Sequence, residues 1–234
     1  MNGVPDGYRT TAPRHARVVE LVGPAGCGKS TLSLALSAVN DEHTYGPNLW
    51  GLPRPVLLRS ALRLGPEIAR TSLTLRAIPG GLLLQMIRVD ALRHLLAETR
   101  SRNTGIILID EGPVFALSWM QVFFPQWNSR HGAGWRERVI TEWAKRLDAV
   151  VRLDADDMVL AQRIRTRAKW HPVKDLPYSE IRRFTARFRE AFDRVLAELT
   201  AMGNVEVIDV RTDSRAADCV SRTGAALREV LHER

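Results

Sequence analysis

Residues 17–31 read RVVELVGPAGCGKST. The first six are mostly apolar, which predicts a short buried strand over 17–22. From Gly23 to Thr31 the chain fits the pattern G-x-x-x-x-G-K-[ST], and a helical pattern starts near Gly28 and ends around Asn40. A glycine-rich turn between a strand and a helix points successive backbone N–H groups, and the positive end of the helix, at one anion. This stretch therefore predicts a phosphate-binding loop in an α/β fold.

The residue types in this loop have expected contacts with a nucleoside triphosphate. Lys29 can reach the β- and γ-phosphate oxygens, the Ser30 hydroxyl can bind Mg²⁺, and Thr31 is expected near the α-phosphate. The glycines let the backbone fold back around the phosphates. The predicted nucleotide-binding residues are Gly23, Ala25, Gly26, Cys27, Gly28, Lys29, Ser30 and Thr31.

A second motif supplies carboxylates at the end of another predicted strand. Four aliphatic residues, 106–109, precede Asp110 and Glu111. A carboxylate in that position lies beside a phosphate loop and orients Mg²⁺, so Ser30 and Asp110 are the predicted metal-binding residues. Glu111 has two interpretations that the sequence leaves open: a base acting on an acceptor hydroxyl or an attacking water, or a surface carboxylate.

An arginine-rich segment follows a third predicted strand, 149–153. On its predicted helix, 157–167, Arg163 and Arg167 share a face, whereas Arg165 joins them only if the helix ends early and the chain turns. Arginines aimed at a phosphoryl group stabilise its developing charge; the alternative is a basic helix face exposed to solvent. The candidate catalytic residues are Lys29, Asp110, Glu111, Arg163, Arg165 and Arg167.

Together these motifs resemble the nucleoside and nucleotide kinases of the P-loop superfamily, in particular thymidylate kinase and the deoxynucleoside kinases. In those enzymes a strand ending in Leu-Asp, here Leu153-Asp154, precedes a helix and an arginine-bearing lid that closes over ATP. The resemblance implies a three-layer α/β/α fold with a mostly parallel sheet and a lid at about 163–178. It also implies that Gln85 and Arg88, on a predicted helix over 82–100, contact the acceptor, and that the protein forms a homodimer.

Two positions depart from the family pattern. Those kinases usually carry Asp-Arg or Glu-Arg after the third strand, where this chain has Asp110-Glu111, so the arginine that would hold an acceptor phosphate or assist the base is missing there. The usual acidic residue after the second strand is not evident either, and Glu67 is the only nearby candidate. These departures leave the acceptor and the catalytic base open.

The rest of the chain predicts a single domain over 17–234, after a disordered lead-in over 1–16. A loop over 119–134 carries aromatic residues that either stack on a base or sugar or cover the edge of the sheet. The other predicted elements are strands at 56–58 and 205–210, helices at 62–75, 135–147 and 179–201, and a helix at the C-terminus.

The net charge of the chain indicates which kinds of partner it can bind. The formal net charge is +8, and of the 34 basic residues only four are lysine, so the charge is mostly arginine scattered over the chain. A basic chain can bind nucleic acid, phosphorylated small molecules or an anionic membrane surface, but scattered charge favours the small molecule over nucleic acid. No segment approaches the roughly 18 consecutive apolar residues of a membrane span, and two cysteines make no disulfide framework. We therefore expect a cytoplasmic protein.

The motifs predict an ATP- and Mg²⁺-dependent phosphotransferase that moves the γ-phosphoryl group of ATP to a small-molecule acceptor. That acceptor is either nucleoside- or nucleotide-like or another hydroxyl compound. Two other functions stay open: adjacent Asp110 and Glu111 also occur in NTPases that hydrolyse ATP as a motor or switch, and the basic composition is compatible with a kinase of nucleic-acid ends. The sequence identifies neither the acceptor nor the base of the nucleotide.

Overall fold

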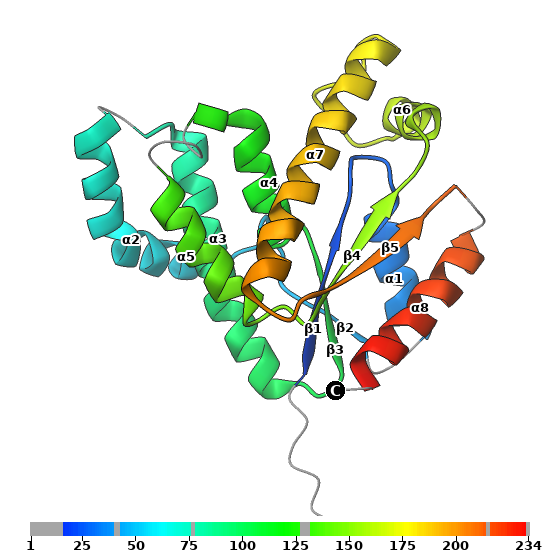
Figure 1. The fold of residues 1–234 in the computed structure, drawn as a ribbon, viewed down its shortest axis with the longest axis horizontal. Helices are drawn as coiled ribbons and strands as arrows, with labels where there is room; N and C mark the ends of the chain where they lie inside the picture. Colours follow the sequence, from blue (N-terminus) through cyan, green and yellow to red (C-terminus); the bar gives the residue numbers. More distant parts are fainter. Residues whose placement is uncertain (1–15, 40–42, 76–77, 127–131, 214–215, 233–234) are drawn as a thin grey trace, which may run out of the picture.

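A computed structural model describes residues 16–39, 43–75, 78–126, 132–213 and 216–232. The predicted lead-in lies outside these residues, except for Ala16, which is fully buried. In the described residues five strands form one sheet, and eight helices surround it (Figure 1).

Strand β1 (Arg17–Val22) lies at the centre of the sheet, as its run of buried residues requires. The strand order is β2-β3-β1-β4-β5, and every pairing is parallel. The other strands are β2 (His43–Tyr45), β3 (Ile106–Asp110), β4 (Ala149–Asp154) and β5 (Glu206–Arg211). Leu21 is opposite Asp110 in β3, so the end of β1 and the end of β3 meet at one edge of the sheet.

The helices cover the sheet in two outer layers, which confirms the predicted α/β/α fold (Figure 1). Strand residues alternate between the layers: Val18 and Val22 belong to the larger core, and Val19 and Leu21 to the smaller one. Helices α1 (Lys29–Val39) and α8 (Ala216–His232) cover the smaller core. The larger core lies under α3 (Gly80–Arg102), α4 (Pro113–Phe123), α5 (Ala133–Ala144) and α7 (Tyr178–Met202); α2 (Arg54–Leu75) packs on α3, and α6 (Asp157–Thr166) on α7.

Most predicted elements are confirmed to within a few residues. The first strand is predicted at 17–22 and found there, and the helix predicted to begin near Gly28 begins at Lys29. The other confirmed elements are β3, β4, β5, α3, α5, α6, α7 and α8. No helix in the described part of the chain is both long enough and apolar enough to cross a bilayer.

Two predictions are wrong, and one strand was not predicted. The strand predicted at 56–58 lies inside α2, which begins at Arg54 and continues through Pro66. The loop predicted at 119–134 begins instead within a helix, since α4 ends only at Phe123. Strand β2 was not predicted, because its three residues lie next to a glycine- and proline-rich stretch. The helix predicted at 62–75 is the later part of α2, whereas α4 was not predicted; both helices carry proline in their first turn, where no intrahelical N–H is needed.

Candidate active site

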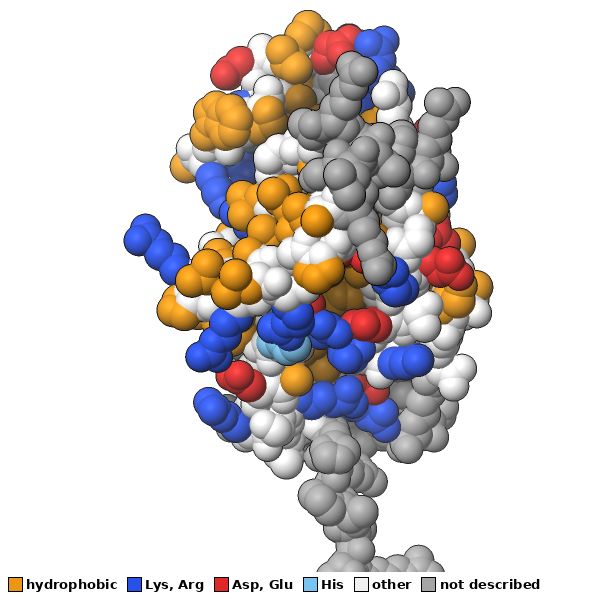
Figure 2. All heavy atoms as spheres, turned by 90° about the vertical axis from the view of Figure 1, so that its left-hand side faces the viewer, with side chains coloured by type: hydrophobic (Ala, Val, Ile, Leu, Met, Phe, Trp, Pro, Cys, Tyr) orange, Lys and Arg blue, Asp and Glu red, His pale blue; other side chains and the backbone are white. Residues whose placement is uncertain are grey.

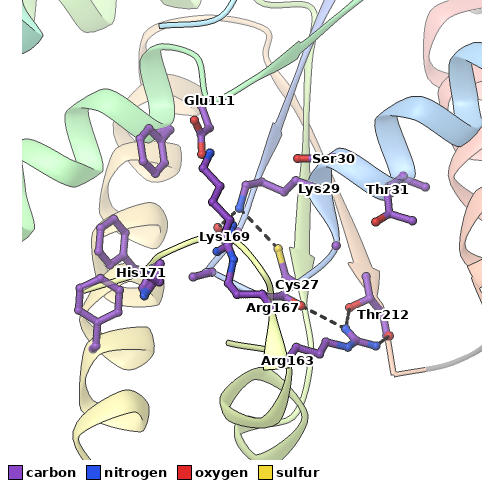
Figure 3. A pocket seen from close by; sticks show the side chains of 18 of the residues that line it. Cys27, Lys29, Ser30, Thr31, Glu111, Arg163, Arg167, Lys169, His171 and Thr212 are labelled. Atoms are coloured by element: carbon purple, nitrogen blue, oxygen red, sulfur yellow. Dashed lines mark hydrogen bonds between the residues drawn. The ribbon is translucent and has the colours of Figure 1, made fainter. Parts of the chain in front are cut away.

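A cavity of about 910 Å³ opens at the carboxyl ends of the central strands. It is lined by the loop between β1 and α1, by α4 and α7, and by the segment after α6, which we call the lid segment (167–177) (Figure 3). This volume is at the upper end of the range for small-molecule sites, which leaves room for two substrates. The crevice at the carboxyl ends of parallel strands is where α/β proteins bind ligands.

The loop after β1 requires glycine at its first position. Gly23 has φ +146°, and a Cβ atom there would lie 2.1 Å from the carbonyl oxygen of Leu153 in β4. Only glycine fits such a close approach, so β4 fixes where the loop turns. At the other end of the loop, Lys29 begins α1, and its ammonium group donates to the carbonyls of Gly23 (2.8 Å) and Pro24 (3.4 Å). The predicted loop residues Gly23 and Ala25 to Thr31 all line the cavity.

Ser30 and Asp110 form a hydroxyl–carboxylate pair at the base of the loop. The Ser30 Oγ donates to Asp110 Oδ2 at 2.8 Å. Asp110 is buried, and its other oxygen, Oδ1, has no hydrogen-bond partner among the described residues. A buried, unpartnered carboxylate oxygen is costly unless a cation or an ordered water contacts it. The pair therefore fits Mg²⁺, a cation that typically uses one or two protein oxygens together with substrate phosphates and water.

Glu111 has an unusual backbone conformation beside this pair. Its φ of +59° is the only positive value among the described non-glycine residues, which marks local strain of the kind found at functional sites. The side chain lines the cavity, and the Lys169 side chain extends toward it (Figure 3). Burial raises the pKa of the Glu111 carboxyl, Asp110 raises it further, and Lys29 and a hydrogen bond from Trp50 oppose the shift.

A buried glutamate holds the backbone that carries Glu111. Glu20, in the middle of β1, accepts hydrogen bonds from the N–H groups of Gly112 (3.0 Å), Val114 (2.9 Å) and Phe115 (3.0 Å) at the start of α4. A Cβ atom at residue 112 would lie 2.8 Å from Glu20 Cδ, so glycine is needed there. Complete burial raises the pKa of Glu20 to about 8, although the three N–H donors oppose the shift.

The structure brings Arg163 and Arg167 to the cavity, but not Arg165. Helix α6 ends at Thr166, and Arg167 follows in extended conformation and lines the cavity. The Arg163 guanidinium donates to the carbonyl of Gly26 (3.3 Å) and to the hydroxyl and carbonyl oxygens of Thr212 (3.2 and 2.9 Å). Arg165 points away: it donates to the carbonyl of Leu176 (2.8 Å), and its guanidinium lies over the ring of Tyr178.

Arg189 of α7 fastens α7 to the start of α6. Its guanidinium pairs with Asp154 (2.9 Å) and Asp157 (2.5 Å) and donates to the carbonyl of Ala155 (2.9 Å). Asp154 is the aspartate of the Leu-Asp pair on which the family resemblance depends. In this chain it therefore anchors a helix, outside the cavity lining.

The residues predicted to contact the acceptor do not line the cavity. Gln85 is buried in α3, and the Arg88 guanidinium lies over the ring of Trp50, 4.4 Å from its centroid. Glu67 is also elsewhere, since it pairs with Arg138 on α5 at 2.5 Å. The position after β2 is Gly46, whose missing Cβ would lie 2.7 Å from Ile107 Cγ2, so that strand brings no carboxylate. Glu111 is thus the only carboxylate among the described lining residues.

Sequence reasoning found only two members, Trp119 and Phe123, of a set of aromatic residues that we call the aromatic wall. Helix α4 contributes rings at every fourth position to one side of the cavity, and α7 contributes two more with the same spacing. Spacing of four along a helix places side chains on one face, which was the available signal. The members are Phe115, Trp119, Phe123, Phe184 and Phe188. The lid residues Lys169 and His171, and Thr212 after β5, are further lining residues that no sequence motif indicated.

The other aromatic residues within and directly after the predicted 119–134 loop have different places. Trp135 is buried in the larger core, and Phe124 packs against that core. Trp127, Arg130 and His131 lie outside the described residues. Some of these aromatic residues thus line the cavity from α4, and others pack in the larger core.

Many of the arginines are engaged in ion pairs away from the cavity. On the face formed by α2, α3 and α5, basic side chains lie next to acidic ones (Figure 2). Arg93 of α3, for example, pairs with Asp90 (2.6 Å) and with Glu142 on α5 (2.5 Å). Exposed pairs of this kind add little stability each, but they neutralise charge that would otherwise attract polyanions.

Comparisons with known proteins show the fold of this chain but not its function. No protein-family model matches the chain, and no curated protein does. Solved structures do match, among them a deoxyadenosine kinase from M. mycoides with the products dCMP and a flexible dCDP bound. That likeness has a TM-score of 0.56 at 13% sequence identity, and it covers 91% of this chain and 99% of that chain. This likeness shows that the chain has a P-loop fold like that of nucleoside kinases. Because one fold can host many activities, the fold alone does not identify the substrate.

Proposed function

We propose that this protein is a Mg²⁺- and ATP-dependent phosphotransferase that moves the γ-phosphoryl group of ATP to the hydroxyl group of a small molecule. The cavity carries this proposal, because a phosphate-binding loop, four cationic side chains and one carboxylate line it together. Such an excess of positive charge suits a polyphosphate. The four cations are Lys29, Arg163, Arg167 and Lys169.

The nucleotide fits at the end of the cavity formed by α1, α6 and α8. Apolar residues of α1 and α8, Leu32, Ala35 and Val220, line that end and offer a surface for the base. Arg163, held flat by its bonds to Thr212, closes one side. The loop N–H groups and Lys29 then hold the phosphates at the start of α1.

Ser30 and Asp110 would hold the metal ion, as the unpartnered Asp110 Oδ1 indicates. When bound, Mg²⁺ neutralises charge on the β- and γ-phosphates. The residues of this chain do the remaining work on the phosphates. Lys29 contacts the transferring group, and Arg163 and Arg167 stabilise the charge that develops in the transition state.

Glu111 is the candidate base for the acceptor hydroxyl. Its carboxyl pKa is raised by burial, which brings it closer to the working pH of a general base. The strained backbone and the bond from Trp50 hold it in one orientation. Closure of the lid segment, with Lys169 and His171, would exclude water, so that ATP is used for transfer and not for hydrolysis.

Two substitutions test this function in an assay of ADP release with and without hydroxyl acceptors. Lys29→Ala should lower acceptor-dependent release at least about 100-fold, while Lys145→Ala, at the end of α5, should not change it. Glu111→Gln keeps the shape of the side chain, and loss of a general base should cost about 10²- to 10⁴-fold in rate with ATP binding retained.

The same assay addresses the alternative that Glu111 activates water in a switch-type NTPase. That function predicts ADP release that no acceptor increases and that Glu111→Gln abolishes. This pattern would overturn the phosphotransferase proposal.

A further inference from the structure

The aromatic wall forms a continuous apolar surface across the cavity. Rings from α4 meet rings from α7: Phe115 and Phe188 are 6.3 Å apart, and Phe123 lies 6.4 Å from Phe184 and 6.2 Å from Phe188. Within each helix the contacts continue, with 4.8 Å between Trp119 and Phe123 and 5.0 Å between Phe184 and Phe188. These spacings are typical of interacting aromatic side chains, so the wall is well ordered before any substrate binds.

Several rings of the cavity remain exposed to solvent. Phe123 is 43% exposed, Trp50 is 51% exposed, and Trp170 in the lid segment is 77% exposed. Exposed rings gathered in a concave site mark a place where a ligand removes apolar surface from water. The ligand that gains most from this surface has a flat, apolar body.

The charged side chains of the cavity come from the loop after β1, from Glu111, from α6 and from the lid segment. Among the described lining residues there is no asparagine or glutamine, and the aromatic wall offers only the indole N–H of Trp119 as a hydrogen-bond donor. His171, which stands edge-on to Phe184 at 5.4 Å, has its pKa lowered to about 4 by burial and is therefore uncharged at neutral pH. A nucleobase bound there would leave most of the hydrogen-bonding groups of its edge without partners, and a site rejects ligands for which buried polar groups stay unpaired.

The charge pattern also disfavours a phosphorylated acceptor. The position after Asp110, where the related kinases place an arginine, is Glu111 in this chain, and Glu111 lines the cavity. A carboxylate there repels an acceptor phosphate. We therefore expect the acceptor to be uncharged.

We propose that the acceptor is an uncharged aromatic alcohol, with its ring system against the aromatic wall and its hydroxyl group at Glu111. This inference rests on the proposed phosphotransferase function. The hydroxyl oxygen attacks the γ-phosphorus, the bond from that phosphorus to the bridging oxygen of ADP breaks, and the hydroxyl proton passes to the Glu111 carboxylate. The products are a phosphate monoester of the alcohol and ADP.

Calorimetric titration without ATP tests the acceptor class separately from the reaction. The probes are naphthylethanol as the aromatic alcohol, deoxyadenosine as the nucleoside and glucose as the polar alcohol. We expect naphthylethanol to bind at least about tenfold more tightly than either of the others, the size of effect that stacking on aromatic side chains gives. Phe123→Ala should weaken that binding about tenfold, and Phe123→Leu should restore part of it.

Leu62→Ala, at an exposed position of α2 outside the cavity, is the matched control and should bind naphthylethanol like the wild type. Each variant is also titrated with ATP, whose affinity should be unchanged. Tighter binding of deoxyadenosine than of naphthylethanol, or equal binding by Phe123→Ala and wild type, would overturn the inference. Failure to bind ATP, with naphthylethanol binding intact, would instead contradict the proposed function alone.

Discussion

The buried carboxyl group of Glu20 should make the free energy of unfolding of this protein fall as the pH rises. Glu20→Gln should remove this dependence. The side chain is completely buried, and its pKa is raised from 4.5 to about 8 in the folded protein. Between these two values the unfolded chain has lost the proton and the folded protein keeps it. Raising the pH in this window therefore favours the unfolded state, and the contribution is fully lost only above about pH 8.

The size of the effect follows from the linkage relation. One proton that the folded state retains and the unfolded state has lost lowers the free energy of unfolding by about 1.4 kcal/mol per pH unit. From about pH 5.5 to about pH 7 the loss is therefore about 2 kcal/mol. Glu20→Gln cannot titrate, so its free energy of unfolding should lack this slope.

Replacing the carboxyl group of Glu20 by an amide also changes one hydrogen bond. This change sets the difference in the free energy of unfolding between the two proteins at low pH. In Glu20 the oxygen Oε1 accepts from Gly112 and Phe115, and Oε2 accepts from Val114. Glutamine keeps the first two bonds and turns a donor toward the third N–H, which costs about 1–3 kcal/mol. Glu20→Gln should thus have a lower free energy of unfolding than the wild type at low pH. This gap between the two free energies should narrow as the pH rises.

Urea unfolding at a series of pH values, followed by circular dichroism without nucleotide or metal, measures this gap. Other titrating groups affect both proteins equally, so the difference between them isolates residue 20. Glu190→Gln, on an exposed part of α7, controls for the loss of one carboxylate from the chain. A gap between wild type and Glu20→Gln that stays constant from about pH 5.5 to about pH 7 would refute the reasoning.

Two further predictions concern the nucleotide end of the cavity. Arg167→Ala should slow phosphoryl transfer about 100-fold or more, whereas Arg165→Ala, whose guanidinium lies on Tyr178, should leave turnover within about twofold in the same ADP-release assay. An equal loss in both variants would place Arg165 at the reacting phosphates after all. Asp110→Asn should raise the Mg²⁺ concentration needed for half-maximal rate at least about tenfold, measured by Mg²⁺ titration with the exposed Asp193→Asn variant as control. An unchanged Mg²⁺ requirement would exclude Asp110 as the metal-binding carboxylate.

The elements that could be predicted are those whose buried positions are occupied by a recognisable pattern of apolar residues. Strand β1 is buried along almost its whole length and was predicted without error, and so was the helix that follows it after a glycine-rich loop. The start of helix α2 could not be predicted, because proline residues usually interrupt a helix. Pro55 lies in the first turn, where proline is tolerated, and α2 passes through Pro66 with packing on α3.

The residues of the loop after β1 that line the cavity could be predicted because local chain geometry builds that loop. The aromatic wall as a whole could not, although the spacing of four within α4 and within α7 is visible in the sequence. Phe123 and Phe184 are 61 positions apart along the chain, and only the packing of α4 against α7 brings them together. The position of Glu111 in the cavity likewise depends on Glu20, which no motif connects to it.

The pairing of Arg189 with Asp154 and Asp157 has a consequence for turnover. Because Arg189, in the middle of α7, pairs with residues at the start of α6, we expect the two helices to move together when ligands enter or leave. Access then depends on rearrangement of the lid segment alone. Lid opening takes microseconds to seconds, and in many enzymes it limits turnover more than chemistry does. We therefore expect product release through the lid segment to limit the catalytic rate, so that a small impairment of the bond-breaking step lowers that rate less than in proportion.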